Sequence, residues 1–179
     1  MSALDAYPGT NNTVVYTEGL LVGYRWYDTK EIEPLFPFGY GLSYTHFKYS
    51  KLNLAQNSDS KNPVTVEFEL ANSGRRAGAE VAEIYVQPVN PSVSRPLKEL
   101  KGFQKVLLQP GEKQKVTVTL DQSAFAYYDL GKKGWVAEKG EYKILVGSSS
   151  RDIRLNGKFS LADTSVVLDN APTPAIAAN

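Results

Sequence analysis

Residues 64–70 read VTVEFEL, and this stretch decides the fold class of the chain. Its apolar residues, which alternate with polar ones, are Val64, Val66, Phe68 and Leu70. A period of two is the pattern of a β-strand with one face toward a core and the other toward water. Residues 115–120, KVTVTL, have the same pattern. Because no long stretch has apolar residues at helical spacing, the sequence predicts an all-β domain.

Turn residues separate these two segments from further strand patterns. We expect strands at 82–86, 97–108, 124–128, 142–146 and 153–161. Uneven apolar spacing predicts a β-bulge near Gly102, Gly157 is expected to kink the last strand, and residues 121–125 suit one short helical turn. About seven or eight short strands at these intervals are typical of an immunoglobulin-like β-sandwich.

The composition excludes several classes of function. The 179 residues include no Cys, so disulfides, thiolate chemistry and Cys-based metal sites are absent. Twenty cationic and 19 anionic residues are interspersed, which does not fit a nucleic-acid-binding surface. No apolar stretch is long enough for a transmembrane helix. His46 is the only His, so we predict no metal and no cofactor, and expect His46 at a solvated strand position.

Working outward toward the amino terminus, residues 14–45 are rich in aromatic side chains. Four blocks stand in order along the chain: YTEG at 16–19, VGYRWYD at 22–28, PLFPFGYGLSYT at 34–45 and RPLKELKGF at 95–103. Together they resemble the carboxy-terminal region of glycoside hydrolase family 3, and the resemblance covers roughly residues 7–161. It implies a fibronectin type III-like β-sandwich with an extended aromatic amino-terminal arm.

The resemblance also implies a division of the chain. Residues 1–45 would be a linker arm and the tail of a preceding α/β sandwich domain, 46–163 the fibronectin type III-like sandwich, and 164–179 a flexible tail. The parent enzyme would be a retaining β-glucosidase that releases terminal β-D-glucosyl residues from β-glucosides or cello-oligosaccharides. Its nucleophilic Asp and acid/base Glu belong to regions outside these blocks, so we expect no catalytic residue here. The family implies a periplasmic or secreted enzyme whose signal lies upstream.

The aromatic zone supplies the candidate site residues, interpreted as inter-domain docking contacts or as the rim of the parent's active site. They are Tyr24, Arg25, Trp26, Tyr27, Asp28, Phe36, Phe38 and Tyr40. Packing is favoured over sugar contact, because aromatic residues and Arg are enriched in buried interfaces. Residues 36–41 are interpreted as a rigid connector rather than a ligand loop. Glu18 with Asp28 could suggest a catalytic pair, but a structural role is favoured for both.

Two further features have competing interpretations. Arg95 and residues 98–101 form a basic cluster, which we interpret as a solvated strand edge rather than an anion site. Trp135 could be a surface platform for a sugar, but a core or interface position is favoured.

Three hypotheses follow for the whole chain. The first is a non-catalytic module that packs against the barrel and α/β domains of its enzyme, in cis or as a separate chain. The second is a module that binds carbohydrate directly, and the third is an oligomerisation module that forms a homodimer. The second and third could equally belong to a related β-xylosidase or another family 3 glycosidase. Exposed aromatics in the arm favour the first, because monomers rarely expose so large an apolar patch.

Overall fold

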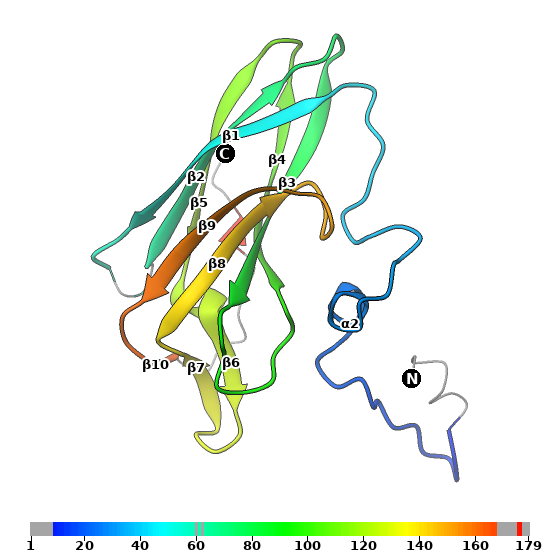
Figure 1. Ribbon diagram of the computed structural model, residues 1–179, viewed down its shortest axis with the longest axis vertical. Helices are drawn as coiled ribbons and strands as arrows, with labels where there is room; N and C mark the ends of the chain where they lie inside the picture. Colours follow the sequence, from blue (N-terminus) through cyan, green and yellow to red (C-terminus); the bar gives the residue numbers. More distant parts are fainter. Residues whose placement is uncertain (1–8, 60, 62, 168–174, 177–179) are drawn as a thin grey trace.

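The computed structural model describes residues 9–59, 61, 63–167 and 175–176, and the fold is the predicted β-sandwich (Figure 1). One sheet has the order β1-β2-β5, and the other has the order β11-β4-β3-β8-β9. The strands of the first sheet are β1 (Phe47–Gln56), β2 (Val64–Asn72) and β5 (Lys113–Leu120). Those of the second are β3 (Gly78–Pro88), β4 (Glu99–Leu108), β8 (Gly140–Gly147), β9 (Ile153–Leu161) and β11 (Ala175–Ile176).

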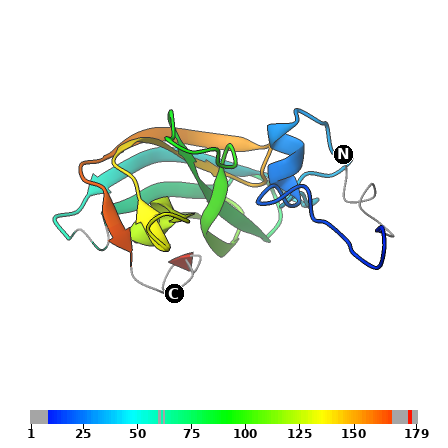
Figure 2. The same ribbon diagram turned by 90° about the horizontal axis from the view of Figure 1, so that it is seen from below.

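A small third sheet and two short helices complete the described structure. The third sheet has the order β10-β7-β6, with β6 (Ala126–Asp129), β7 (Gly134–Ala137) and β10 (Ser165–Val167). The helical turn predicted at 121–125 is confirmed as the 3₁₀-helix η1 (Gln122–Phe125), which is capped by the side chain of Asp121. The helix α2 (Tyr24–Thr29) lies in the arm, beside one end of the sandwich (Figure 2).

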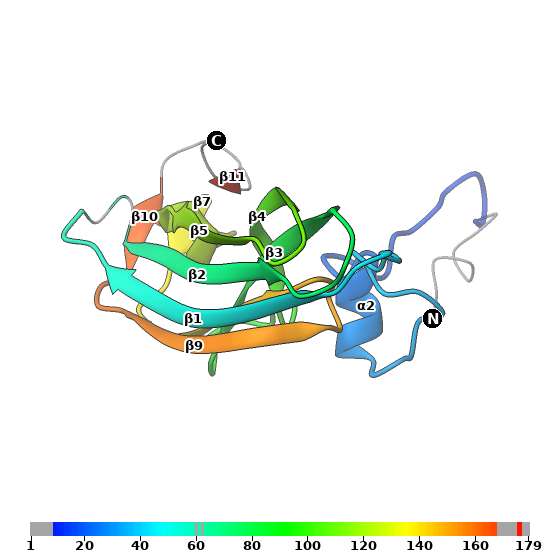
Figure 3. The same ribbon diagram turned by 90° about the horizontal axis from the view of Figure 1, so that it is seen from above.

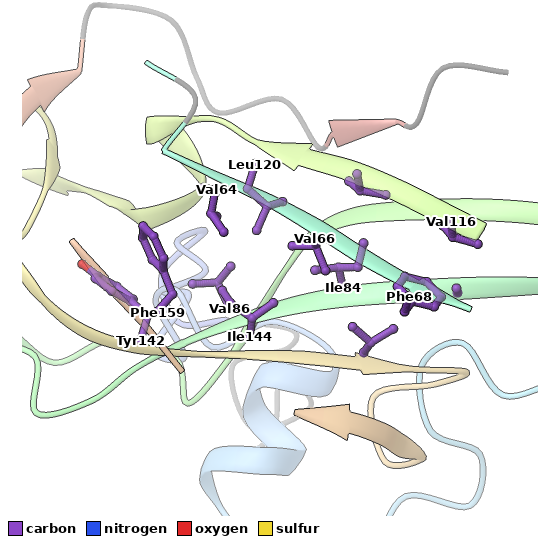
Figure 4. Packing of buried hydrophobic residues seen from close by; sticks show 14 of the residues in the cluster. Val64, Val66, Phe68, Ile84, Val86, Val116, Leu120, Tyr142, Ile144 and Phe159 are labelled. Atoms are coloured by element: carbon purple, nitrogen blue, oxygen red, sulfur yellow. The ribbon is translucent and has the colours of Figure 1, made fainter. Parts of the chain in front are cut away.

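The core lies between the two large sheets. In β2 every second residue is fully buried, as the alternation predicted. Figure 4 shows the apolar side chains of Val64, Val66 and Phe68 pointing toward those of the facing sheet, among them Ile84, Val86 and Ile144. Each such side chain contributes on the order of 1.5–3 kcal/mol by leaving water. A core of this size explains how the chain folds without Cys.

No sequence pattern indicated β1, although it is ten residues long. Its pairing with β2 shifts register between Ser50 and Asn53, and Lys51 there has φ of 58°. The irregularity breaks the period of two in the middle of the strand, so the apolar pattern is hidden. Figure 3 shows β1 running alongside β9 of the other sheet.

Two predictions concerned glycines in strands of the second sheet. The bulge near Gly102 is confirmed: Ile84 pairs with Gly102 and the next residue pairs with Leu100, so Lys101 is the extra residue. The kink at Gly157 stays a prediction: the ladder with β8 runs through Gly157 without a register shift, and the irregularity of this pair lies between Val146 and Gly147. A Cβ at Gly157 would lie 2.8 Å from Leu54 Cδ1, so this glycine lets β9 approach β1 closely.

The domain boundaries at 45/46 and 163/164 remain predictions. Most of the tail predicted to be flexible lies outside the described residues. Of its described part, Ser165–Val167 pair antiparallel with β7, and Ala175–Ile176 pair parallel with β4. Within the described ranges, no helix has the length and apolar character needed to cross a membrane.

Candidate interdomain docking site

The arm is fixed to the sandwich through Asp28, the buried residue of α2. Its Oδ1 forms a salt bridge with Arg151 Nε at 2.6 Å, and its Oδ2 forms one with Lys98 Nζ. Arg151 lies in the β8–β9 loop, and Lys98 precedes β4. Arg151 also donates to the carbonyl oxygens of Tyr27 at 3.3 Å and Ile32 at 3.0 Å. One carboxylate and one guanidinium therefore hold the helix and the chain that follows it.

Tyr24, the first residue of α2, makes the aromatic contact between the helix and the sandwich. Its hydroxyl oxygen accepts a hydrogen bond from the Leu100 N–H at 2.8 Å. Its ring meets Tyr85 of β3 edge to face, with centroids 5.8 Å apart, and Phe38 at 5.2 Å. Arg25 pairs with Glu99 at 3.2 Å. Edge-to-face geometry and a satisfied hydroxyl are what a half-buried Tyr requires.

Because the arm covers the face of β3 that would otherwise be exposed to solvent, this strand is buried on both faces. Residues 82–86 are all buried, although Glu83 and Tyr85 alternate with the apolar ones. The Tyr85 hydroxyl donates to Glu83 Oε2 at 2.5 Å. Burial raises the pKa of Glu83, and the hydrogen bond from Tyr85 partly opposes this shift. In the described part of the chain, no cation forms a salt bridge with Glu83.

Gly39 packs directly on this carboxyl group. It has φ of 83°, and a Cβ built on it would overlap the carboxylate oxygens of Glu83. The adjacent Phe38 carbonyl accepts a hydrogen bond from the Ser150 N–H at 2.8 Å. The connector therefore touches the sandwich with its backbone, which explains why glycine stands here.

Replacing Gly39 with Ala is expected to loosen the connector by roughly 2 kcal/mol or more, from the left-handed backbone and the clash with Glu83. The measurement is the rate of limited proteolysis within residues 29–45, with Gly41→Ala as the matched control. A Cβ added at Gly41 would meet no other atom within 4 Å, so this variant should be cut at the wild-type rate. Equal rates for all three proteins would contradict the role given to Gly39.

The arm also carries a set of exposed apolar side chains. We call it the outer layer; its members are Tyr16, Leu20, Val22, Tyr27, Leu35, Phe36, Tyr40, Leu42 and Tyr44. Leu35, Leu42 and Tyr44 are each about 90% exposed, at 89%, 91% and 91%. Phe36 and Tyr40 contact each other, with ring centroids 5.3 Å apart. A patch of this kind on an anchored arm is typical of a surface covered by another protein domain.

The predicted site residues thus divide into those that contact the sandwich and those whose side chains are exposed. Tyr24, Arg25 and Asp28 contact the sandwich, together with the backbone of Phe38. Tyr27, Phe36 and Tyr40 belong to the outer layer. Trp26 is half-buried, with Lys30 Nζ 5.2 Å from its ring centroid. Whether any of them reaches an active site of the parent enzyme stays a prediction.

Four anchoring residues were not recognised from sequence: Glu83, Lys98, Glu99 and Arg151. The solvated-edge interpretation of the basic cluster is wrong, because the side chains of Arg95, Lys98 and Lys101 are 3%, 13% and 11% exposed. Each is paired with a carboxylate, which is how buried cations are tolerated. A run of mixed charge, KELK, beside a bulge could have indicated that these cations are buried in ion pairs.

The remaining candidates have ordinary surroundings. Glu18 lies in a turn, where its carbonyl accepts from the Leu21 N–H at 3.0 Å. His46 is exposed and immediately precedes β1. Trp135 packs against the core and meets Tyr128 edge to face at 5.7 Å. Among the described residues, no three His, Cys, Asp or Glu side chains are grouped as metal ligands.

Comparison with known proteins agrees with this geometry. The family model of the fibronectin type III-like domain matches residues 80–150. Thermostable beta-glucosidase B of Acetivibrio thermocellus is 55% identical over 88% of the chain and 21% of its own length. Beta-glucosidase BoGH3A of Bacteroides ovatus is 45% identical over 83% of the chain and 20% of its own length. The chain thus spans about a fifth of the length of these relatives.

Solved structures give the same alignment. Beta-glucosidase 3B from Thermotoga neapolitana, in complex with alpha-D-glucose, superposes with a TM-score of 0.84 at 39% identity, covering 92% of this chain and 23% of that one. The GH3 beta-glucosidase of Bifidobacterium adolescentis gives 0.86 at 38% identity, covering 96% and 26%. The fold is therefore that of a fibronectin type III-like domain. The chain corresponds to the carboxy-terminal, fibronectin type III-like portion of glycoside hydrolase family 3 β-glucosidases.

Proposed function

We propose that this portion is non-catalytic and packs through its arm against the barrel and α/β domains of a family 3 enzyme, which it stabilises. The whole enzyme would be a retaining β-glucosidase acting on terminal β-D-glucosyl residues. Support comes from the relatives and solved structures named above, which are β-glucosidases in which this region is one part of a longer chain. Retaining hydrolysis needs two carboxyl groups about 5–5.5 Å apart, and the proposal places both in the other domains.

The outer layer is the observation on which the proposal mainly depends. Its apolar side chains face water in the isolated chain, while Asp28, Lys98 and Arg151 fix the arm at α2. Fixing an apolar surface in advance lowers the entropy lost when a partner covers it. An arm that served only as a flexible linker would gain nothing from a buried ion pair.

Binding to the remaining polypeptide tests the proposal. The chain, mixed with a fragment that contains the other domains of the same enzyme, is expected to elute from a sizing column as one complex. Leu42→Asp, in the outer layer, should weaken the complex at least roughly tenfold. Leu107→Asp is the matched control, since Leu107 is 66% exposed but lies on β4. Independent elution of the two wild-type pieces would contradict the proposal.

Two finer points, the substrate and the location of the enzyme, belong to the same proposal. The substrate would be a β-glucoside or cello-oligosaccharide bound by the parent enzyme. The enzyme would be periplasmic or secreted, as the family implies.

A homodimer through the outer layer is the competing assembly. Light scattering of the free chain at increasing concentration distinguishes it, because a dimer has twice the mass.

A further inference from the structure

A groove separates the arm from the β6–β7 hairpin, and it is distinct from the Asp28 contacts. Its volume is about 880 Å³, and its lining includes the segment that leads into β4. Four apolar side chains on its wall are well exposed: Leu20 at 67%, Val93 at 40%, Tyr128 at 49% and Leu130 at 84%. Leu20 is also part of the outer layer, so the groove continues the surface proposed to dock.

Three cations around one carboxylate set the electrostatics of the groove. Glu99 lies 3.2 Å from Arg25, 3.4 Å from Arg95 and 3.7 Å from Lys101. The other carboxylate of the lining, Asp129, accepts hydrogen bonds from the N–H groups of Gly131 and Lys132 in its own turn. One Glu must therefore compensate three positive side chains.

Lys101 is the cation with the least compensation. Arg95 donates to the carbonyl oxygens of Phe125 and Ala126 and lies over the Tyr127 ring, 5.4 Å from its centroid. The side chain of Lys101 is only 11% exposed, and the carboxylate oxygen that it pairs with lies 3.7 Å away. Burial lowers the pKa of Lys101, and both neighbouring guanidinium groups lower it further against the opposing effect of Glu99.

We infer that the groove receives a carboxylate side chain from the domain that docks on the arm, and that Lys101 and Arg25 bind it. The inference rests on the proposed function. Docking on the apolar rim would remove the remaining water from these two cations, which share the single carboxylate of Glu99 with Arg95. Buried positive charge that one carboxylate compensates only in part is strongly unfavourable. An Asp or Glu flanked by apolar residues would satisfy the cations and cover the rim at once. A neutral sugar would leave the excess positive charge uncompensated.

A pair of lysine variants tests the inference in the complex with the remaining enzyme fragment. Lys101→Met is expected to raise the dissociation constant roughly 30-fold or more, as for loss of one member of a buried interfacial pair. Lys105→Met, an exposed position on the same strand, should stay within about twofold of wild type. Thermal unfolding of each free variant identifies any loss of folding.

A second measurement needs no variant. Carbodiimide joins amines to carboxylates in direct contact, so mass spectrometry of the treated complex should show Lys101 linked to an Asp or Glu of the partner. In the free chain Lys101 should link to Glu99 only. Wild-type affinity in Lys101→Met, or a Glu99 link alone in the complex, would overturn the inference while leaving the docking proposal intact. Cello-oligosaccharide binding to the free chain that disappears in Lys101→Met would also overturn it. Failure of the wild-type chain to bind at all would instead remove the proposed function.

Discussion

Replacing Asp28 with Ala is expected to lower the free energy of opening the arm by about 3–5 kcal/mol, the cost of breaking a buried ion pair by removing one partner. The side chain of Asp28 is 5% exposed and binds both Lys98 and Arg151, so its loss leaves two cations facing an empty position. Hydrogen exchange of the backbone amides in residues 24–40 measures the opening. These amides should lose protection while those of β2 and β8 keep it.

The control uses the other acidic partner of Arg151. Glu33 lies 3.5 Å from Arg151 Nη1, but its side chain is 85% exposed. Exposed pairs contribute about 0–1 kcal/mol, so Glu33→Gln should leave the exchange of the arm nearly unchanged. Wild-type protection of the arm in Asp28→Ala would show that Tyr24 and Arg25 suffice to hold α2.

Replacing Phe68 with Ala is expected to destabilise the whole sandwich by about 3–5 kcal/mol. Phe68 is 1% exposed, and its ring stacks on Tyr49, with centroids 5.9 Å apart, across the β1–β2 pair. Its removal leaves a cavity that the surrounding β-branched side chains cannot fill. Chemical denaturation followed by circular dichroism measures the loss as a lower midpoint with an unchanged slope.

An exposed phenylalanine provides the control for this variant. Phe36 is 64% exposed in the outer layer, so Phe36→Ala should change the stability of the free chain by less than about 1 kcal/mol. The same variant is expected to weaken binding to the rest of the enzyme. A large loss of stability in Phe36→Ala would mean that the outer layer packs on the sandwich rather than on a partner.

The core could be predicted from sequence wherever one face of a strand is exposed to solvent. Val64, Val66, Phe68 and Leu70 alternate with polar residues, and all four are buried. Prediction failed where a local irregularity or a tertiary cover intervened. The bulge at Lys51 hid β1, and the arm buries Glu83 and Tyr85 on what would otherwise be the solvent face of β3. Six residues are too few for α2 to show a helical period.

The candidate site was predictable as a segment but not as a set of contacts. The aromatic blocks located the arm, and Asp28 stood among the candidates. Its partners are 70 and more than 100 positions away, and nothing in sequence spacing connects Asp28 with Lys98 or Arg151. Charge patterning on one strand suggested solvated side chains, whereas Lys98 is buried against Asp28 of the arm, a contact that the local sequence does not indicate.

The arm is connected to the sandwich along two separate paths. Its polypeptide continues through Thr45 into β1 of the first sheet, whereas Asp28 reaches β4 and the β8–β9 loop of the second. A pull exerted by a neighbouring domain on the amino-terminal side would therefore reach the two sheets by different routes. Tension meets the ion pairs before it reaches the β1 ladder. The ion pairs of Asp28 would therefore break first. They can form again, and the strands of the sandwich would stay paired meanwhile.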